Sequence, residues 1–168
     1  MAKTKTTYDR ALNLIAFRAR STSELRRQLL RKGEPAPDVE AAIARLLEQR
    51  LLNDADFARQ FARVKLTGAG ASRLRIVQEL GRKGIARSDA EAAVDKMTED
   101  EGIDPAANIH RVAEKKWRSL SKLEEATARR RLYAFLARRG FNPDEISIAL
   151  GRLPGANVRL LDKRQRYS

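Results

Sequence analysis

The stretch Asp54–Ile85, DADFARQFARVKLTGAGASRLRIVQELGRKGI, contains two helical patterns joined by a Gly-rich connection, and it ends in a basic pair followed by a glycine and an isoleucine. Its second half recurs on both sides in the chain. The three segments are ELRRQLLRKGE at 24–34, RIVQELGRKGI at 75–85 and RRLYAFLARRGF at 130–141, and they align on Gly33, Gly84 and Gly140. The sequence therefore contains three imperfect copies of one unit.

Apolar residues recur at fixed distances from each glycine. Positions eight and four residues before it share one face of a helix, and they hold Leu25 and Leu29, Ile76 and Leu80, and Leu132 and Leu136. A second amphipathic helix follows each glycine, with Val39, Ile43 and Leu46, then Ala90, Val94 and Met97, then Ile146, Leu150 and Leu153. A period of about 50 residues is typical of tandem helical units.

These patterns predict an all-α chain of three tandem three-helix repeats that form an elongated, curved array. We place the repeats at 7–53, 54–104 and 105–153, after a disordered tail at 1–6 and before a basic C-terminal tail at 154–168. No stretch alternates with period two, so we predict no sheet. A serine followed three residues later by a glutamate predicts a capping box at the start of a helix, and this pattern occurs at Ser21, Ser88 and Ser121.

The composition indicates a folded protein. Of 168 residues, 42% are hydrophobic, which suffices for a core, and the absence of cysteine excludes disulfides and thiolate metal sites. No apolar run approaches the roughly 20 residues of a membrane span, and the first ten residues lack the apolar segment of a secretory signal. We expect a soluble, cytoplasmic protein with no membrane contact.

The net charge of +13 is the strongest global signal. Such an excess creates a long-range positive field, which predicts a polyanionic partner: nucleic acid, an acidic protein surface, or a nucleoprotein. Compositional drift toward arginine is the alternative explanation. Aromatic residues make up only 5% of the chain, which argues against a platform that stacks single-stranded bases.

The sequence shows no catalytic constellation. His110 is the only histidine, and with no cysteine present a metal site of the usual ligands is not indicated. The segment Gly68-Ala69-Gly70 lacks the Gly-Lys-Ser/Thr ending of a phosphate-binding loop, and no Gly-x-Ser-x-Gly motif is present. We therefore predict a protein that is not an enzyme and that uses no cofactor or metal.

A basic pair precedes each of the three aligned glycines. Cations in the last turn of a helix stabilise its negative end, and a glycine there can adopt the left-handed conformation, so capping alone can explain each pair. Further arginines one or more turns earlier on the same helices favour a wider basic stripe. The candidates for contact with a polyanion are Arg27, Arg31, Lys32, Arg75, Arg82, Lys83, Arg130, Arg131, Arg138 and Arg139. Trp117 lies on an apolar stripe and is predicted to belong to the core.

The order and spacing of these residues resemble the RecX family of bacterial regulatory proteins. The segment 54–85 is similar to the family's pattern at Asp54, Phe57-Ala58, Gly68, Gly70, Ile76, Glu79-Leu80 and Lys83-Gly84-Ile85. The first unit is similar at Ala11-Leu12, Ser23-Glu24-Leu25 and Leu29, and the last at Leu136, Arg139-Gly140-Phe141 and Ile146. The resemblance covers about residues 8–153.

The resemblance implies a chain of three-helix repeats that binds the RecA filament on DNA. It further implies a non-enzymatic inhibitor of ATP hydrolysis, strand exchange and co-protease activity, which modulates DNA repair, DNA recombination and the SOS response. Weak, salt-sensitive contact with single-stranded or duplex DNA and a monomeric state are also expected. One departure is that the Gly-aromatic-Gly-Pro turn common in the family is Gly68-Ala69-Gly70-Ala71 here.

The alternative is a free-standing helical DNA-binding protein that acts through a basic surface. Both hypotheses use the same charge, but they differ in shape and assembly. A DNA-binding protein of the helix-turn-helix type needs one recognition helix and usually a two-fold dimer, whereas a filament ligand needs an extended array.

Small-angle scattering tests the predicted array. A compact sphere of this length has a radius of gyration of about 15 Å. Side-by-side repeats should give a clearly larger value for the monomer, because each repeat then contacts only its neighbours. A value near that of the sphere would contradict the array.

Overall fold

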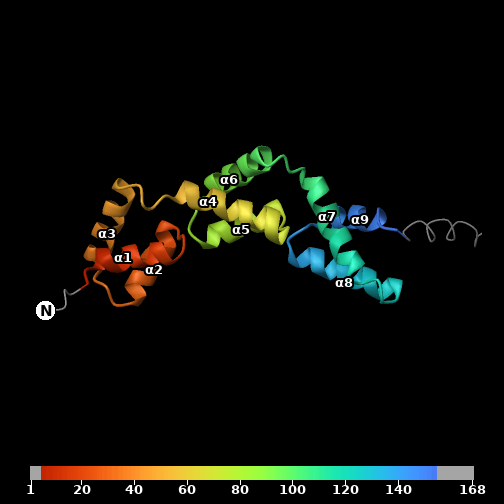
Figure 1. Ribbon diagram of the computed structural model, residues 1–168, viewed down its shortest axis with the longest axis horizontal. Coiled ribbons are helices and arrows are strands. Elements are labelled where there is room, and N and C mark those ends of the chain that lie inside the picture. Colours follow the sequence, from red (N-terminus) through yellow and green to blue (C-terminus); the bar gives the residue numbers. More distant parts are fainter. Residues whose placement is uncertain (1–4, 155–168) are drawn as a thin grey trace, which may run out of the picture. The chain divides into compact units, whose positions relative to one another are not determined.

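The computed structural model describes residues 5–154, apart from the side chains of residues 105 and 106. Within this range the chain forms helices and no strand, which confirms the all-α prediction (Figure 1). The predicted tails fall mostly outside the described residues, although Thr6 caps the first helix. The chain divides into two compact units. Among the described residues, one unit comprises the chain up to Val64 together with Ile76–Met97, and the other comprises Lys65–Arg75 together with the chain from Thr98 onward.

The first unit begins with three helices around one core. Helices α1 (Thr7–Phe17) and α2 (Thr22–Arg31) pack against each other and against α3 (Ala36–Glu48). Their shared core consists of Ala11, Leu25, Leu29, Val39, Ala42, Ile43, Leu46 and Leu52. All five apolar positions predicted for this repeat are therefore buried.

The middle of the chain contributes to both units. Helix α4 (Asp54–Arg63) begins after Asn53, whose side chain accepts from the N–H groups of Ala55 and Asp56. Helix α5 (Arg73–Arg82) has its first three residues in the second unit and the rest in the first. Helix α6 (Arg87–Asp100) belongs to the first unit as far as Met97. The buried residues include Phe57, Ala58, Ala62, Ile76, Leu80, Ala90 and Val94.

The second unit contains the third bundle. Helices α7 (Pro105–Arg118), α8 (Glu125–Arg138) and α9 (Pro143–Gly151) pack on one another in pairs. Their core includes Ile109, Val112, Ala113, Leu132, Leu136, Phe141 and Ile146, and Trp117 packs against it partly buried. The tryptophan therefore packs against the core, as its apolar stripe indicates, but it is not one of the fully buried residues.

The Gly-rich connection ends a helix in an unusual way. The chain leaves α4 through a π-helix, Val64–Ala69, and regular structure stops at Gly70. Gly70 has a φ of +59°, and a Cβ there would lie 2.3 Å from Cγ2 of Val112 on α7. The second glycine of the Gly-rich connection, Gly70, is thus required by both the backbone conformation and a close approach.

Two of the three predicted capping boxes are wrong, and the third is formed only in part. Ser21 accepts from the N–H of Glu24, but the Glu24 carboxylate turns to Lys83 instead of the backbone. Ser88 lies inside α6, where Glu91 accepts from Arg87. At Ser121 the chain forms turns that bury Leu120 and half-bury Leu123, so α8 starts later, with Glu124 as its N-cap.

Gly84 lies at a close junction between α5 and α2. Its φ is +84°, and a Cβ at this position would lie 2.3 Å from Cβ of Ser23. The Ser21 hydroxyl donates to the carbonyl of Lys83, and Arg27 donates to the carbonyl of Arg82 over 3.3 Å. The N-terminus of α2 therefore satisfies carbonyls at the C-terminus of α5.

The same chemistry recurs between α8 and the start of α5, within the second unit. The Ser72 hydroxyl donates to the carbonyl of Gly140 over 2.7 Å, and the Ser72 N–H donates to that of Arg139 over 3.0 Å. A Cβ at Gly140 would lie 2.6 Å from Cβ of Arg75. At Gly33, by contrast, φ is also positive but an added Cβ would meet no described atom within 4 Å.

Three alanine substitutions separate the two requirements on these glycines. Gly33→Ala should destabilise the fold by about 1–2 kcal/mol, because only the left-handed backbone is strained. Gly84→Ala should cost about 1–3 kcal/mol more, because its Cβ also collides with Ser23. Urea unfolding measures both. The control is Gly81→Ala within α5, where space is open and a gain of up to about 1 kcal/mol is expected. Equal losses at Gly33 and Gly84 would contradict the junction.

Candidate polyanion-binding surface

The ten predicted cations lie on or directly after α2, α5 and α8, and they differ in exposure. Seven are exposed: Arg27, Arg31, Lys32, Arg82, Arg130, Arg131 and Arg138. Arg75, Lys83 and Arg139 are half-buried. The first unit brings Arg27 together with Arg82 and Lys83, and the second brings Arg75 close to the Arg139-Gly140 turn.

Lys83 is engaged inside the first unit. Its Nζ lies 2.8 Å from Oε1 of Glu24, and these side chains are only 24% and 14% exposed. It also lies 5.7 and 5.4 Å from the ring centroids of Phe57 and Phe61. Cation–π contacts of this kind hold an ammonium group in place. The charge of Lys83 is therefore already paired with a carboxylate.

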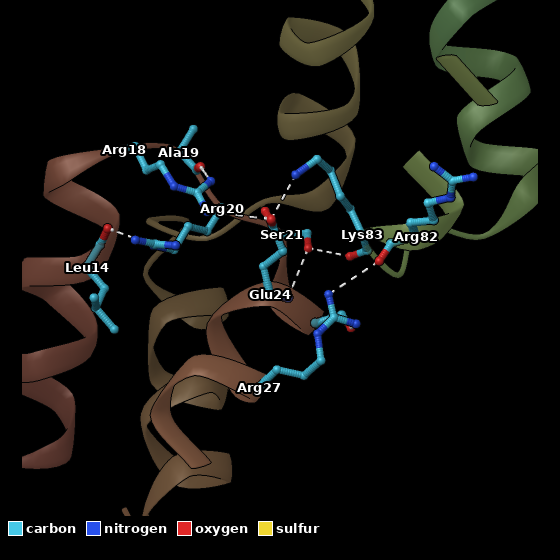
Figure 2. A network of polar contacts seen from close by, with 10 residues as sticks. Leu14, Arg18, Ala19, Arg20, Ser21, Glu24, Arg27, Arg82 and Lys83 are labelled. Atoms are coloured by element: carbon cyan, nitrogen blue, oxygen red, sulfur yellow. Dashed lines mark hydrogen bonds and ion pairs between the residues drawn. The ribbon is translucent and has the colours of Figure 1, made fainter. Parts of the chain in front are cut away.

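Glu24 lies among three cations, Arg18, Arg20 and Lys83 (Figure 2). Arg18 Nη2 lies 3.6 Å from the carboxylate, and Arg20 Nε donates to the carbonyl of Leu14. Burial alone would raise the pKa of Glu24, but the hydrogen bond and charge of Lys83, together with Arg18, lower this pKa below its usual value. Glu24 is thus ionised at neutral pH.

Arg27 shows a second use of a basic residue. Its guanidinium donates to the carbonyl of Arg82 and to the hydroxyl of Ser23 (Figure 2). A cation at the carbonyl end of a helix stabilises that end. Part of the basic pattern therefore serves the contact between repeats, where an arginine of one helix caps another. From the sequence we expected such cations to cap only their own helix, so this contact with a second helix was not predicted.

Sequence reasoning missed several cations that the structure places beside the predicted ones. Arg18 and Arg20 follow α1, and Arg111, Lys115 and Lys116 lie on α7, where only the apolar stripe was considered. Arg111 and Lys115 are four residues apart and so share a helix face, a signal that was present in the sequence. Lys116 lies 5.4 Å and Arg139 4.3 Å from the centroid of Phe135.

The described residues contain neither a cluster of metal-binding side chains nor a membrane-spanning helix. No group of three or more His, Asp or Glu side chains in residues 5–154 is arranged to hold a metal ion. His110 Nε2 lies 3.0 Å from Nη1 of Arg152. None of the helices in this part of the chain is both long and apolar enough to span a bilayer.

Three family models match the chain in order. Residues 8–46 match the first three-helix domain of RecX, residues 53–94 the second and residues 104–150 the third. Among solved structures, the chain resembles the crystal structure of RecX from Lactobacillus salivarius, with a TM-score of 0.67, 22% identity, and coverage of 86% of this chain and 92% of the other. At that identity the likeness supports the fold alone.

Curated relatives extend the match over most of both chains. The regulatory protein RecX of Pelodictyon phaeoclathratiforme is 38% identical over 149 residues, which cover 88% of this chain and 89% of the relative. That of Amycolatopsis mediterranei is 36% identical, with coverage of 77% and 72%. This chain therefore belongs to the RecX family of regulatory proteins.

Proposed function

We propose that this protein binds the RecA filament on DNA and inhibits ATP hydrolysis, strand exchange and co-protease activity. In this way it would modulate DNA repair, DNA recombination and the SOS response. The observation that supports the proposal is that all three RecX domains match in chain order across residues 8–150. We expect it to act in the cytoplasm as a monomer, without catalysis of its own.

The charge of the protein suits a nucleoprotein partner. The net charge is +13, and exposed arginines lie on α2, α5 and α8. A filament that carries DNA presents phosphates, and electrostatic attraction speeds encounter with such a target. Because this attraction depends on counterion release, contact with naked DNA should be weak and sensitive to salt.

Tandem repeats suit a partner made of repeated subunits. If successive repeats contact neighbouring subunits, each later contact forms at high effective concentration, so several weak contacts add to a strong one. A ligand that bridges subunits also restrains their relative movement, which would slow an ATPase cycle that depends on it. Inhibition thus requires no catalytic group in this chain.

DNA-dependent ATP hydrolysis by RecA tests the proposal. Substoichiometric amounts of the protein should lower the hydrolysis rate and strand exchange, because one bridging ligand restrains several subunits. The control is an equal amount of a small basic protein with no RecX domain. Unchanged hydrolysis, together with tight binding of naked duplex at physiological salt, would instead favour the free-standing DNA-binding protein.

A charge-reversal pair tests the exposed surface of α8. Arg131→Glu with Arg138→Glu should weaken binding to filaments and to DNA. The slope of log affinity against log salt concentration should become shallower by about 1 for each phosphate that is no longer neutralised. Arg118→Glu with Lys122→Glu changes the net charge equally at exposed positions of the same unit. Equal affinity of the two folded variants would remove Arg131 and Arg138 from the surface.

A further inference from the structure

A cavity of about 280 Å³ in the second unit is lined by four cations. It lies between residues 67–70 of the Gly-rich connection and helices α7 and α8. Arg111, Lys115 and Lys116 come from α7, and Arg139 follows α8. None of the described residues that line this cavity is acidic. Among the four, only Arg139 was a candidate from the sequence.

Three of these four cations are held in position by neighbouring groups. Arg111 Nη2 donates to Oδ1 of Asn108 over 2.9 Å, and buried Asn108 donates to the carbonyl of Ala71. The ring of Phe135 lies within cation–π distance of both Lys116 and Arg139. These contacts orient the cations but supply no negative charge, so the site is preorganised for an anion.

Arg139, which lines this cavity, has one polar group without a hydrogen-bond partner among the described residues. Its Nε is buried and has no hydrogen-bond partner in the described part of the chain. Burial lowers the pKa of its guanidinium, but an arginine remains protonated in proteins at neutral pH. A buried N–H without an acceptor is unfavourable, and Arg139 lines the cavity. An anion that enters would compensate its charge.

The size and chemistry of the cavity limit the ligand. Its volume lies just below the roughly 300 Å³ at which pockets for drug-sized ligands begin, so it fits one phosphate-sized group with its substituents. Phe135 is engaged by two cations, which disfavours base stacking on its ring. Cations that contact phosphate oxygens fix a strand without reading its bases.

We propose that this cavity binds a phosphodiester group of a nucleic-acid strand. Nucleic acid is favoured over an acidic protein because, with one phosphate in the cavity, the neighbouring phosphates of the same backbone lie close by and can neutralise the cations at its edge. The site deepens the proposed function by giving the third repeat its own contact with DNA. The biological role of the site rests on the proposed function, but phosphate binding itself does not, because binding is measured without RecA.

Binding of the full chain to a fluorescent oligonucleotide, followed by anisotropy over a range of salt concentrations, tests the site. Lys115→Ala with Lys116→Ala should weaken binding several-fold and lower the salt slope by about 1 for each phosphate that the variant no longer neutralises. Arg118→Ala with Lys122→Ala removes equal charge at exposed positions outside the cavity, and should change binding much less. Circular dichroism checks that each variant is folded.

A second variant blocks the cavity without altering charge. Ala69 is exposed and lines it, so Ala69→Tyr should occupy the space and weaken oligonucleotide binding while the net charge stays the same. Gly81→Ala is a charge-neutral control outside the cavity and should bind normally.

Three results would overturn the proposal. These are equal losses of affinity in the two double variants, normal binding by folded Ala69→Tyr, and displacement of the oligonucleotide by polyglutamate more readily than by polyphosphate of matched charge. The last result would assign the cavity to an acidic protein partner. RecA inhibition is measured separately, so failure of the phosphate site and failure of filament regulation give different results.

Discussion

The contacts between successive repeats depend on a serine hydroxyl at the N-terminus of a helix, which both accepts and donates a hydrogen bond. Ser21 accepts from the N–H of Glu24 in its own helix and donates to the carbonyl of Lys83 from another repeat. Ser72 does the same with the N–H of Arg75 and the carbonyl of Gly140. A hydroxyl can do this because it has one donor and two acceptor positions. The backbone segment that supplies the carbonyl must approach the serine-containing segment closely, which explains the glycine at each contact.

Local patterns predicted the helices and their buried faces well, because burial of one face follows directly from helical spacing. Leu25, Ile76 and Leu132 are all fully buried at equivalent positions. Helix starts were predicted less well. Ser121 has the sequence of a cap, yet burial of Leu120 after α7 moves the start of α8 to Glu125. The second role of Gly84 was also missed, since Ser23 is distant in the chain.

The candidate site was predicted as a set of basic residues, and the structure shows that some of them stabilise contacts between repeats. Lys83 pairs with Glu24 and Arg27 caps α5, so their charges already stabilise the fold. Composition and spacing cannot reveal this, because both partners lie in a different repeat. Lys115 and Lys116 were not predicted because they lie outside the segments that align on the three glycines. Only the folded chain places them beside Arg139.

The junction chemistry also means that the repeats are not interchangeable modules. The hydroxyls of Ser21 and Ser72 can each donate a hydrogen bond. The cap of α8 is instead the Glu124 side chain, which accepts from the N–H groups of Ala126 and Thr127, and an ionised carboxylate has no proton to donate. A gene fusion that put the α8 segment in the place of α5 would set this carboxylate against the carbonyls that Ser72 now satisfies. Such an exchange would leave a carbonyl at the junction without its donor, which is unfavourable when the group is buried. Each serine and the glycine-containing turn that it contacts, although distant in sequence, therefore act as one structural unit.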